Sequence, residues 1–211
     1  MKIGIIGTGE VGRSLGTGFK KLGHEVMIGS RDAQKKELQD WARETGGKAG
    51  TFADTAKFGD VVFLCTGWSG TQNAITLAGE ANLKGKVVVD VTNPLDFSTG
   101  KPQLAVGYTD SAGEKVQHWL PGSKVVKAFN IIGAKFMTDG RVADGQLDMF
   151  IAGNDAGAKE TVKGFLTAFH WNTHDLGGIE QARLLEPLAM LWIWLGVTTN
   201  SWNHAFRLIR K

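Results

Sequence analysis

Cysteine and tyrosine are almost missing from the sequence, and each shortage excludes a class of protein. With one cysteine, Cys65, the chain can form neither an internal disulfide nor a structural zinc site rich in cysteine. The single tyrosine, Tyr108, is followed four positions later by Ala112. A short-chain dehydrogenase needs Tyr-x-x-x-Lys for proton transfer, so the sequence does not belong to that class.

Excess charge of one sign and long apolar runs are also lacking. The 24 basic and 21 acidic residues give a net charge of +3 without a basic run, which suits a small anionic ligand better than nucleic acid. The longest strongly apolar stretch, residues 187–197, is far shorter than the roughly 20 residues of a membrane span. No cleavable apolar segment precedes the first strand pattern. We therefore expect a cytoplasmic protein with neither a nucleic-acid partner nor a membrane partner.

Glycine, by contrast, is abundant, with 29 residues that interrupt apolar runs as tight turns would. Between these turns, strand patterns alternate with helix patterns. We expect strands at residues 2–7, 25–29, 48–52, 60–65, 86–90 and 124–130, and helices at 10–22, 32–45, 69–79 and 111–120. Such alternation predicts an α/β fold, a Rossmann-type, doubly wound and mainly parallel sheet with helices on both faces.

The C-terminal part has a different pattern. Two predicted strands, 147–153 and 171–176, flank a helix at 155–169, and a long apolar helix at 179–197 precedes a closing helix at 202–209. We expect a Rossmann domain at 1–153 and a strand and helical extension at 154–211 packed on it, or one single domain. The helix at 179–197 is apolar around most of its circumference, so it needs partners on all sides. One sheet covers only one side, and this predicts a homodimer that buries the helix.

A G-x-G-x-x-G motif lies between the first strand and the first helix. The first glycine allows a tight turn, the second lets a pyrophosphate approach the backbone, and the third lets helix and strand pack closely. The pyrophosphate then lies at a helix N-terminus, where free N–H groups favour anions. The motif predicts dinucleotide binding by Gly7, Thr8, Gly9, Glu10, Val11 and Gly12.

The end of the second strand indicates which dinucleotide is bound. An acidic residue there binds the ribose hydroxyls of NAD, whereas a cation accommodates the 2′-phosphate of NADP. Here Ser30 and Arg31 end the strand, and Lys35 lies one helical turn further on. The sequence therefore predicts NADP(H), with a solvated Arg-Asp turn as the alternative reading.

Three later strand ends meet the same crevice in a parallel sheet. Asparagines there can bind the ribose or the carboxamide, and Trp68 either packs on the cofactor or belongs to the core. Lys127, just before the last of these ends, is predicted to be a snorkelling or cofactor-side lysine, or else a general acid. The predicted cofactor residues at these ends are Thr66, Gly67, Trp68, Thr92, Asn93, Pro94, Phe129, Asn130 and Ile131.

Together these motifs resemble the NADPH-dependent F420 (deazaflavin) reductase family over nearly the whole chain. The Rossmann domain is also similar to the cytosolic part of STEAP-type metalloreductases. The resemblance rests on the glycine motif, on Gly29-Ser30-Arg31, on Asn93-Pro94, on residues 127–130 and on residues 182–188. It implies that Thr8, Ser30, Arg31 and Lys35 contact the NADP phosphates, and that Asn93 and residues 129–133 frame the nicotinamide.

Three functions remain open. The first is an oxidoreductase that moves hydride between NADP(H) and a small-molecule acceptor, either coenzyme F420 or a flavin. The second is a non-enzymatic NADPH-binding sensor or scaffold. The third is a reductase of a small carbonyl or imine, which needs a proton donor that the sequence does not reveal. No catalytic side chain is identified, and the five histidines show no metal-binding pattern.

Overall fold

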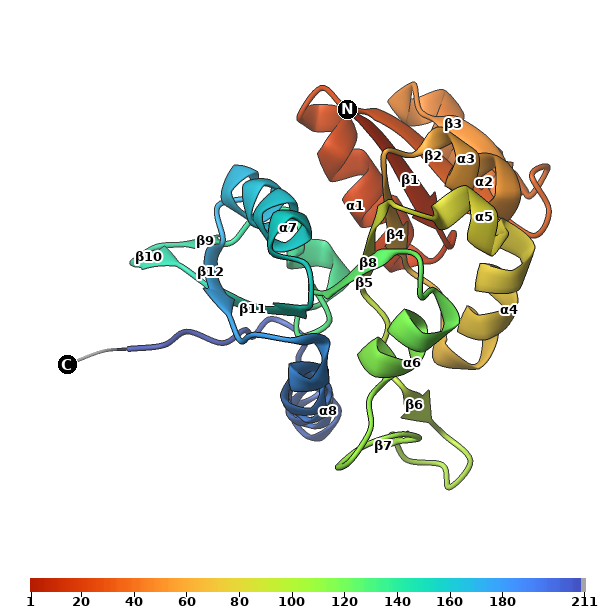
Figure 1. The fold of residues 1–211 in the computed structure, drawn as a ribbon. Coiled ribbons are helices and arrows are strands. Elements are labelled where there is room, and N and C mark those ends of the chain that lie inside the picture. The colour runs from red at the N-terminus through yellow and green to blue at the C-terminus, as the bar shows by residue number, and fades with distance from the viewer. Residues whose placement is uncertain (210–211) are drawn as a thin grey trace.

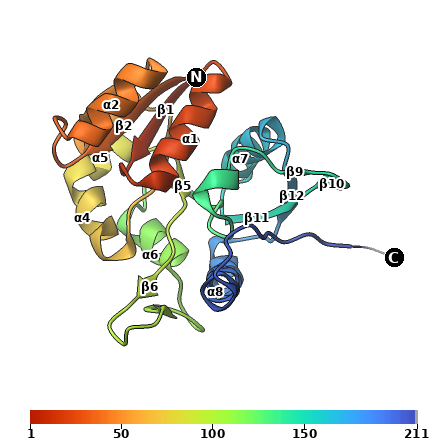
Figure 2. The same ribbon diagram turned by 180° about the vertical axis from the view of Figure 1, so that it is seen from behind.

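The computed structural model describes residues 1–209, which form an eight-stranded sheet with helices on both faces (Figure 1, Figure 2). The strand order is β12-β11-β8-β5-β4-β1-β2-β3. Neighbouring strands run parallel except β8 and β11, which pair antiparallel. The predicted Rossmann-type fold is confirmed. The strands are β1 (Lys2–Ile6), β2 (Glu25–Ser30), β3 (Lys48–Thr51), β4 (Val61–Leu64), β5 (Val87–Asp90), β8 (Lys124–Lys127), β11 (Asp148–Gly153) and β12 (Asn172–Asp175).

Alternate residues along each strand enter two apolar layers, one on each face of the sheet. Ile5 and Phe63 face one layer, and their neighbours Ile6 and Leu64 face the other. Because both faces are covered, the central strands β1 and β4 are mainly apolar instead of alternating with polar residues. The first layer contains α1 (Glu10–Lys21), α2 (Lys36–Thr45) and α7 (Ala156–Ala168), and the second contains α3 (Phe52–Phe58), α4 (Trp68–Ala78), α5 (Glu80–Leu83) and α6 (Ala112–Trp119).

The long helix α8 (Ala182–Thr199) follows a short 3₁₀ turn, η2 (Ile179–Gln181), and lies against α6, β11 and the strand β7 (Gln103–Leu104). β7 pairs with β6 (Leu95–Asp96) in a small hairpin beside α8 (Figure 1). A second hairpin, β9 (Arg141–Val142) with β10 (Gly145–Gln146), follows the 3₁₀ turn η1 (Ala134–Phe136). β11 and β12 continue the main sheet, and the division into domains at residue 153 stays a prediction.

Residues 202–209 are not helical, so the prediction of a closing helix is wrong. The segment is extended, and β11 and α8 hold it through specific hydrogen bonds. The carbonyl of Phe206 accepts from the backbone of Asp148, whose carboxylate accepts from the N–H of Leu208. The carbonyl of His204 accepts from the indole N–H of Trp192. The apolar spacing that favoured a helix places side chains against α8 in an extended strap instead.

Two further boundaries differ from the expected ones. Phe52 begins α3 and does not end the third strand, because Thr51 and Asp54 form a capping box that starts a helix there. Helix α2 begins at Lys36, after a turn in which the carboxylate of Asp32 accepts from the N–H of Gln34. These short-range hydrogen bonds override the hydrophobic pattern at the element ends.

Candidate functional site

The glycine turn between β1 and α1 adopts a conformation that requires glycine at two of its three positions. Gly7 has a φ of 127°, and a Cβ there would lie 2.4 Å from the carbonyl oxygen of Cys65. A Cβ on Gly12 would lie 2.1 Å from the carbonyl oxygen of Gly7, so only glycine lets α1 approach the strand this closely. At Gly9 nothing lies within 4 Å of a Cβ, so the N-terminus of α1 is open to a ligand.

A cavity of about 780 Å³ opens at this turn, at the C-terminal ends of β1, β2 and β4. Eight of the predicted residues line it, namely Gly7, Thr8, Gly9, Ser30, Arg31, Lys35, Thr66 and Gly67. Ser69 and Asn73, in the first turns of α4, and Phe52, at the start of α3, also line the cavity and were not predicted. Their only signal was their place just after a strand end.

The cavity has a cationic edge. Arg31 is exposed, and within residues 1–209 its guanidinium forms no hydrogen bond or ion pair. Lys35 Nζ lies 3.4 Å from Thr8 Oγ1 and 3.8 Å from a carboxylate oxygen of Glu37. Ser30 is buried, and its hydroxyl accepts from the N–H of Asp32. This edge presents one guanidinium and one ammonium to an anion that enters from the solvent.

Four predicted residues near these strand ends do not line the cavity. Glu10 is exposed and lies near α2. Val11 packs against the first apolar layer, and Gly12 is buried in the first turn of α1. Trp68 is half-buried and stacks on Trp119 of α6, with the ring centroids 5.5 Å apart. Both rings also pack against the second apolar layer, which agrees with the core interpretation of Trp68, and its contact with the cofactor stays a prediction.

Two asparagines meet where β5 and β8 end. The Asn93 side chain donates to the carbonyl of Asn130, 2.8 Å away, and the Asn130 side chain donates to Asn93 Oδ1 and to the carbonyl of Leu185. Asn130 is 3% exposed, yet its Oδ1 has no hydrogen-bond partner within residues 1–209. This oxygen is closed off from solvent, and neither asparagine lines the cavity at the glycine turn.

The backbone around this pair is held in an unusual conformation. Phe129 is fully buried with a φ of 63°, a value that bulky residues rarely adopt. Thr92, Pro94 and Ile131 on either side are also buried. Strain of this kind persists only where the surroundings enforce it and is found at functional sites. The turn therefore fixes Asn130 at the end of β8.

Lys127 lies beneath these asparagines, and the structure corrects its predicted role. Its ammonium is fully buried and does not reach the solvent or the cavity, so it is not a snorkelling or cofactor-side lysine. Nζ lies 2.9 Å from Asp90 and 3.0 Å from Glu186, and it donates to the carbonyl of Thr92. The paired carboxylates raise the pKa of Lys127 despite its burial, and a lysine held in this way is a poor proton donor.

Cys65 directly follows β4 and lines the cavity, and its thiol is held in the protonated form. Burial, with a smaller contribution from the charge of Asp90, raises the pKa of this thiol well above its usual range. A nucleophilic cysteine needs a lowered pKa. Cys65 is therefore unsuited to act as a nucleophile.

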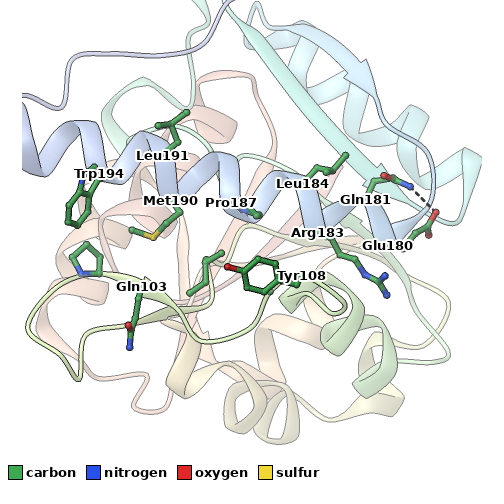
Figure 3. A pocket seen from close by; sticks show the side chains of 13 residues that line it. Gln103, Tyr108, Glu180, Gln181, Arg183, Leu184, Pro187, Met190, Leu191 and Trp194 are labelled. Carbon is green, nitrogen blue, oxygen red and sulfur yellow. Dashed lines mark hydrogen bonds between the residues drawn. The ribbon is translucent and has the colours of Figure 1, made fainter.

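A second, apolar hollow of about 1000 Å³ lies between α8 and the chain around β7, away from the glycine turn (Figure 3). Figure 3 shows Leu184, Met190, Leu191 and Trp194 on the helix and Gln103 and Tyr108 on the facing segment. Leu184 is 60% exposed and Tyr108 is 98% exposed. We call this surface the α8 groove.

Two kinds of site were not found in the part of the chain that is described. Within residues 1–209, no three histidine, cysteine, aspartate or glutamate side chains gather as metal ligands. None of the helices in that range has the length and apolarity that crossing a bilayer takes.

Comparison with known proteins identifies the family. The family model described as NADP oxidoreductase, coenzyme F420-dependent, matches residues 2–94. The chain is 32% identical to the F420-dependent NADP reductase of Methanothermobacter marburgensis over 99% of this chain and 98% of that protein. It is 31% identical to the metalloreductase STEAP3 of Rattus norvegicus over 92% of this chain, but it spans 38% of that longer protein.

A solved structure agrees with this assignment. A putative F420-dependent NADP reductase from Arthrobacter sp. FB24 superposes with a TM-score of 0.93 at 40% identity, and the match covers 100% of both chains. The chain therefore belongs to the family of coenzyme F420-dependent NADP oxidoreductases, and it is an NADP-dependent oxidoreductase.

Proposed function

We propose that this chain transfers hydride between NADP(H) and a deazaflavin or flavin-like acceptor, with coenzyme F420 as the first candidate. The observation that carries the proposal is the cationic cavity at the glycine turn. Arg31 at its edge forms no hydrogen bond or ion pair within residues 1–209. The F420-dependent reductase named above, which matches this chain over nearly its full length, supports the deazaflavin.

In this proposal the residues of the cavity bind the phosphates. The backbone of Gly7, Thr8 and Gly9 and the N-terminus of α1 hold the pyrophosphate. Ser30, Arg31 and Lys35 hold the 2′-phosphate, for which the planar guanidinium offers two parallel N–H donors. Thr66 and Gly67 line the opposite wall.

The nicotinamide end belongs to the turns after β5 and β8. Asn93, Pro94 and residues 129–133 frame the ring, and the hydrogen-bonded pair of Asn93 and Asn130 fixes the two turns at that end. The cofactor and the acceptor supply the redox chemistry, so the protein has to hold two rings at reacting distance. Asparagines, buried backbone and apolar side chains serve that purpose without an acid–base pair.

Turnover with different acceptors tests the proposal. NADPH oxidation is followed with purified protein and acceptors of four classes in turn: an oxidised deazaflavin, oxidised FMN, a ferric chelate and a cyclic imine. We expect the deazaflavin to react fastest. NADPH binding without turnover of any acceptor would favour the sensor or scaffold, and turnover confined to the imine would favour the third function.

We further propose a homodimer that buries the α8 groove, with a second copy of this chain as the occupant. The packed face of α8 carries Trp192 and Glu186, whereas Leu184, Leu191 and Trp194 on the outer face are 60%, 51% and 41% exposed. A monomer rarely exposes so large an apolar patch. Light scattering at micromolar protein is expected to give twice the 22.7 kDa chain mass, and Leu191→Asp is expected to give a monomer.

We also propose that the protein acts in the cytoplasm on a small-molecule acceptor, without a nucleic-acid or membrane partner. The single cysteine and the near balance of charge support this proposal. Fractionation of cells that express the full chain tests it, and recovery with the membranes would contradict it.

A further inference from the structure

Three charged side chains are buried together between β5, β8 and α8. Asp90, Lys127 and Glu186 are 0%, 0% and 1% exposed, and the lysine Nζ lies 2.9 Å and 3.0 Å from the two carboxylates. We call these residues the buried triad. Two carboxylates face one ammonium, so the triad carries an excess negative charge when all three are ionised.

Burial of such a cluster is not explained by stability. Apolar side chains of similar volume are often as stabilising as a buried ion pair, because removing charges from water is unfavourable. The N–H groups of Ala112 and Gly113, at the start of α6, donate to Glu186 and offset part of its charge. They are dipoles and not a second cation, so the triad remains negative overall.

The triad lies directly behind the turn that follows β5. Asp90 Oδ1 accepts from both the N–H and the hydroxyl of Thr92, and Lys127 donates to the carbonyl of the same residue. Asn93, the next residue, is hydrogen-bonded to Asn130. The negative charge of Asp90 also acts on a residue of the cavity, because it adds to the effect of burial in raising the pKa of Cys65.

We propose that the buried triad makes this site favour the oxidised cofactor over the reduced one. The nicotinamide ring of NADP⁺ carries a positive charge that the ring of NADPH lacks, so a buried negative charge beside the ring stabilises only the oxidised form. The inference rests on the proposed function, since it places the nicotinamide at Asn93 and Asn130. It assigns Glu186 and Asp90 as residues that set the redox preference without touching the reacting atoms.

Binding of the two cofactors, without any acceptor, tests the proposal. The Kd values of NADP⁺ and NADPH are measured at pH 8 for the wild-type protein and for Glu186→Gln, which removes one charge of the triad. Unit charges about 10 Å apart in an effective dielectric of about 20–40 change an affinity about 4- to 15-fold. We expect Kd(NADP⁺)/Kd(NADPH) to rise by about that factor in the variant.

Two variants provide matched controls. Glu114→Gln removes a carboxylate from the same α6–α8 junction, but one that is 21% exposed and paired with Arg183, and the ratio should stay within about 2-fold. Glu186→Asp keeps the charge and should keep the wild-type ratio. Should Glu186→Gln fail to fold, Asp90→Asn removes the other negative charge of the triad, and the same change in the ratio is expected.

Each outcome separates this inference from the proposed function. Equal weakening of NADP⁺ and NADPH would show that Glu186 only holds α8 in place, and it would overturn the inference. So would a wild-type protein that binds NADPH much more tightly than NADP⁺. If neither cofactor binds to the wild-type protein, the proposed function falls, and the inference falls with it.

Discussion

Replacing Arg31 by alanine should remove most of the preference for NADPH over NADH. Arg31 lies at the edge of the nucleotide cavity, and its guanidinium has no partner within residues 1–209. The substitution therefore breaks no hydrogen bond or ion pair within residues 1–209 of the free protein. NADH has no 2′-phosphate, so its affinity should change little.

The magnitude follows from the exposure of this site. A hydrogen bond to a charged group contributes about 1.5–3 kcal/mol, and a guanidinium can make two to one phosphate. Arg31 is exposed, so solvent screening reduces the sum to about 1.5–3 kcal/mol. At about 1.4 kcal/mol per factor of ten, NADPH should bind about 10- to 100-fold more weakly.

The assay is a titration of NADPH and NADH, followed by quenching of tryptophan fluorescence, against wild type and Arg31→Ala. Arg43→Ala is the control, because Arg43 is an exposed arginine of α2 that pairs with Asp40 outside the cavity. Equal losses for NADPH and NADH would refute the reasoning. They would mean that Arg31 supports the loop or stacks on the adenine instead of binding the phosphate.

Three other predictions concern the interior and the nicotinamide end. Lys127→Met leaves two buried carboxylates without their cation, so urea denaturation should show a free energy of unfolding lower by about 3–5 kcal/mol. Lys163→Met, at a more exposed ion pair with Glu160, should lower it by less than about 1 kcal/mol. Similar losses in the two variants would contradict this account of the triad. Asn130→Ala should lower turnover by misplacing the nicotinamide, whereas alanine at any one of the five histidines should leave turnover intact. If a histidine variant folded and bound NADPH but lost activity, the reaction would need that histidine as a general acid. Burial raises the pKa of Glu186 above its usual 4.5, so this group binds more protons in the folded state and its contribution to stability falls as the pH rises above about 4.5. Glu186→Gln should flatten that part of the stability curve, and an unchanged slope would show that another group causes it.

Much of the nucleotide-binding half was predictable, because its signals are local. The glycine turn, the strands on both sides of it and the cation at the end of β2 depend on short stretches of sequence whose chemistry leaves few options. The structure places Gly7, Thr8, Gly9, Ser30, Arg31 and Lys35 around one cavity, as the sequence indicated.

What could not be predicted depends on contacts between distant residues. Lys127 pairs with Asp90 in β5 and with Glu186 in α8. Glu186 lies 59 positions further along the chain, and the sequence near Lys127 does not indicate either partner. The extended strap at residues 202–209 is held by Asp148 and Trp192 in the same way. Trp68 stacks on Trp119 for a comparable reason, since α4 and α6 become neighbours only in the folded sheet.

An isotope label follows the hydride itself from NADPH to the deazaflavin. NADPH that carries deuterium at C4 of the nicotinamide is oxidised by the wild-type protein with coenzyme F420 in ordinary water, and the reduced deazaflavin is analysed by mass spectrometry. C4 carries two hydrogens, one on each face of the ring, and each is labelled in a separate experiment. We expect the deuterium on one face to reach the deazaflavin, while the accompanying proton comes from water. Deuterium found only in the solvent, or no reduction of the deazaflavin while NADPH is bound, would contradict the account.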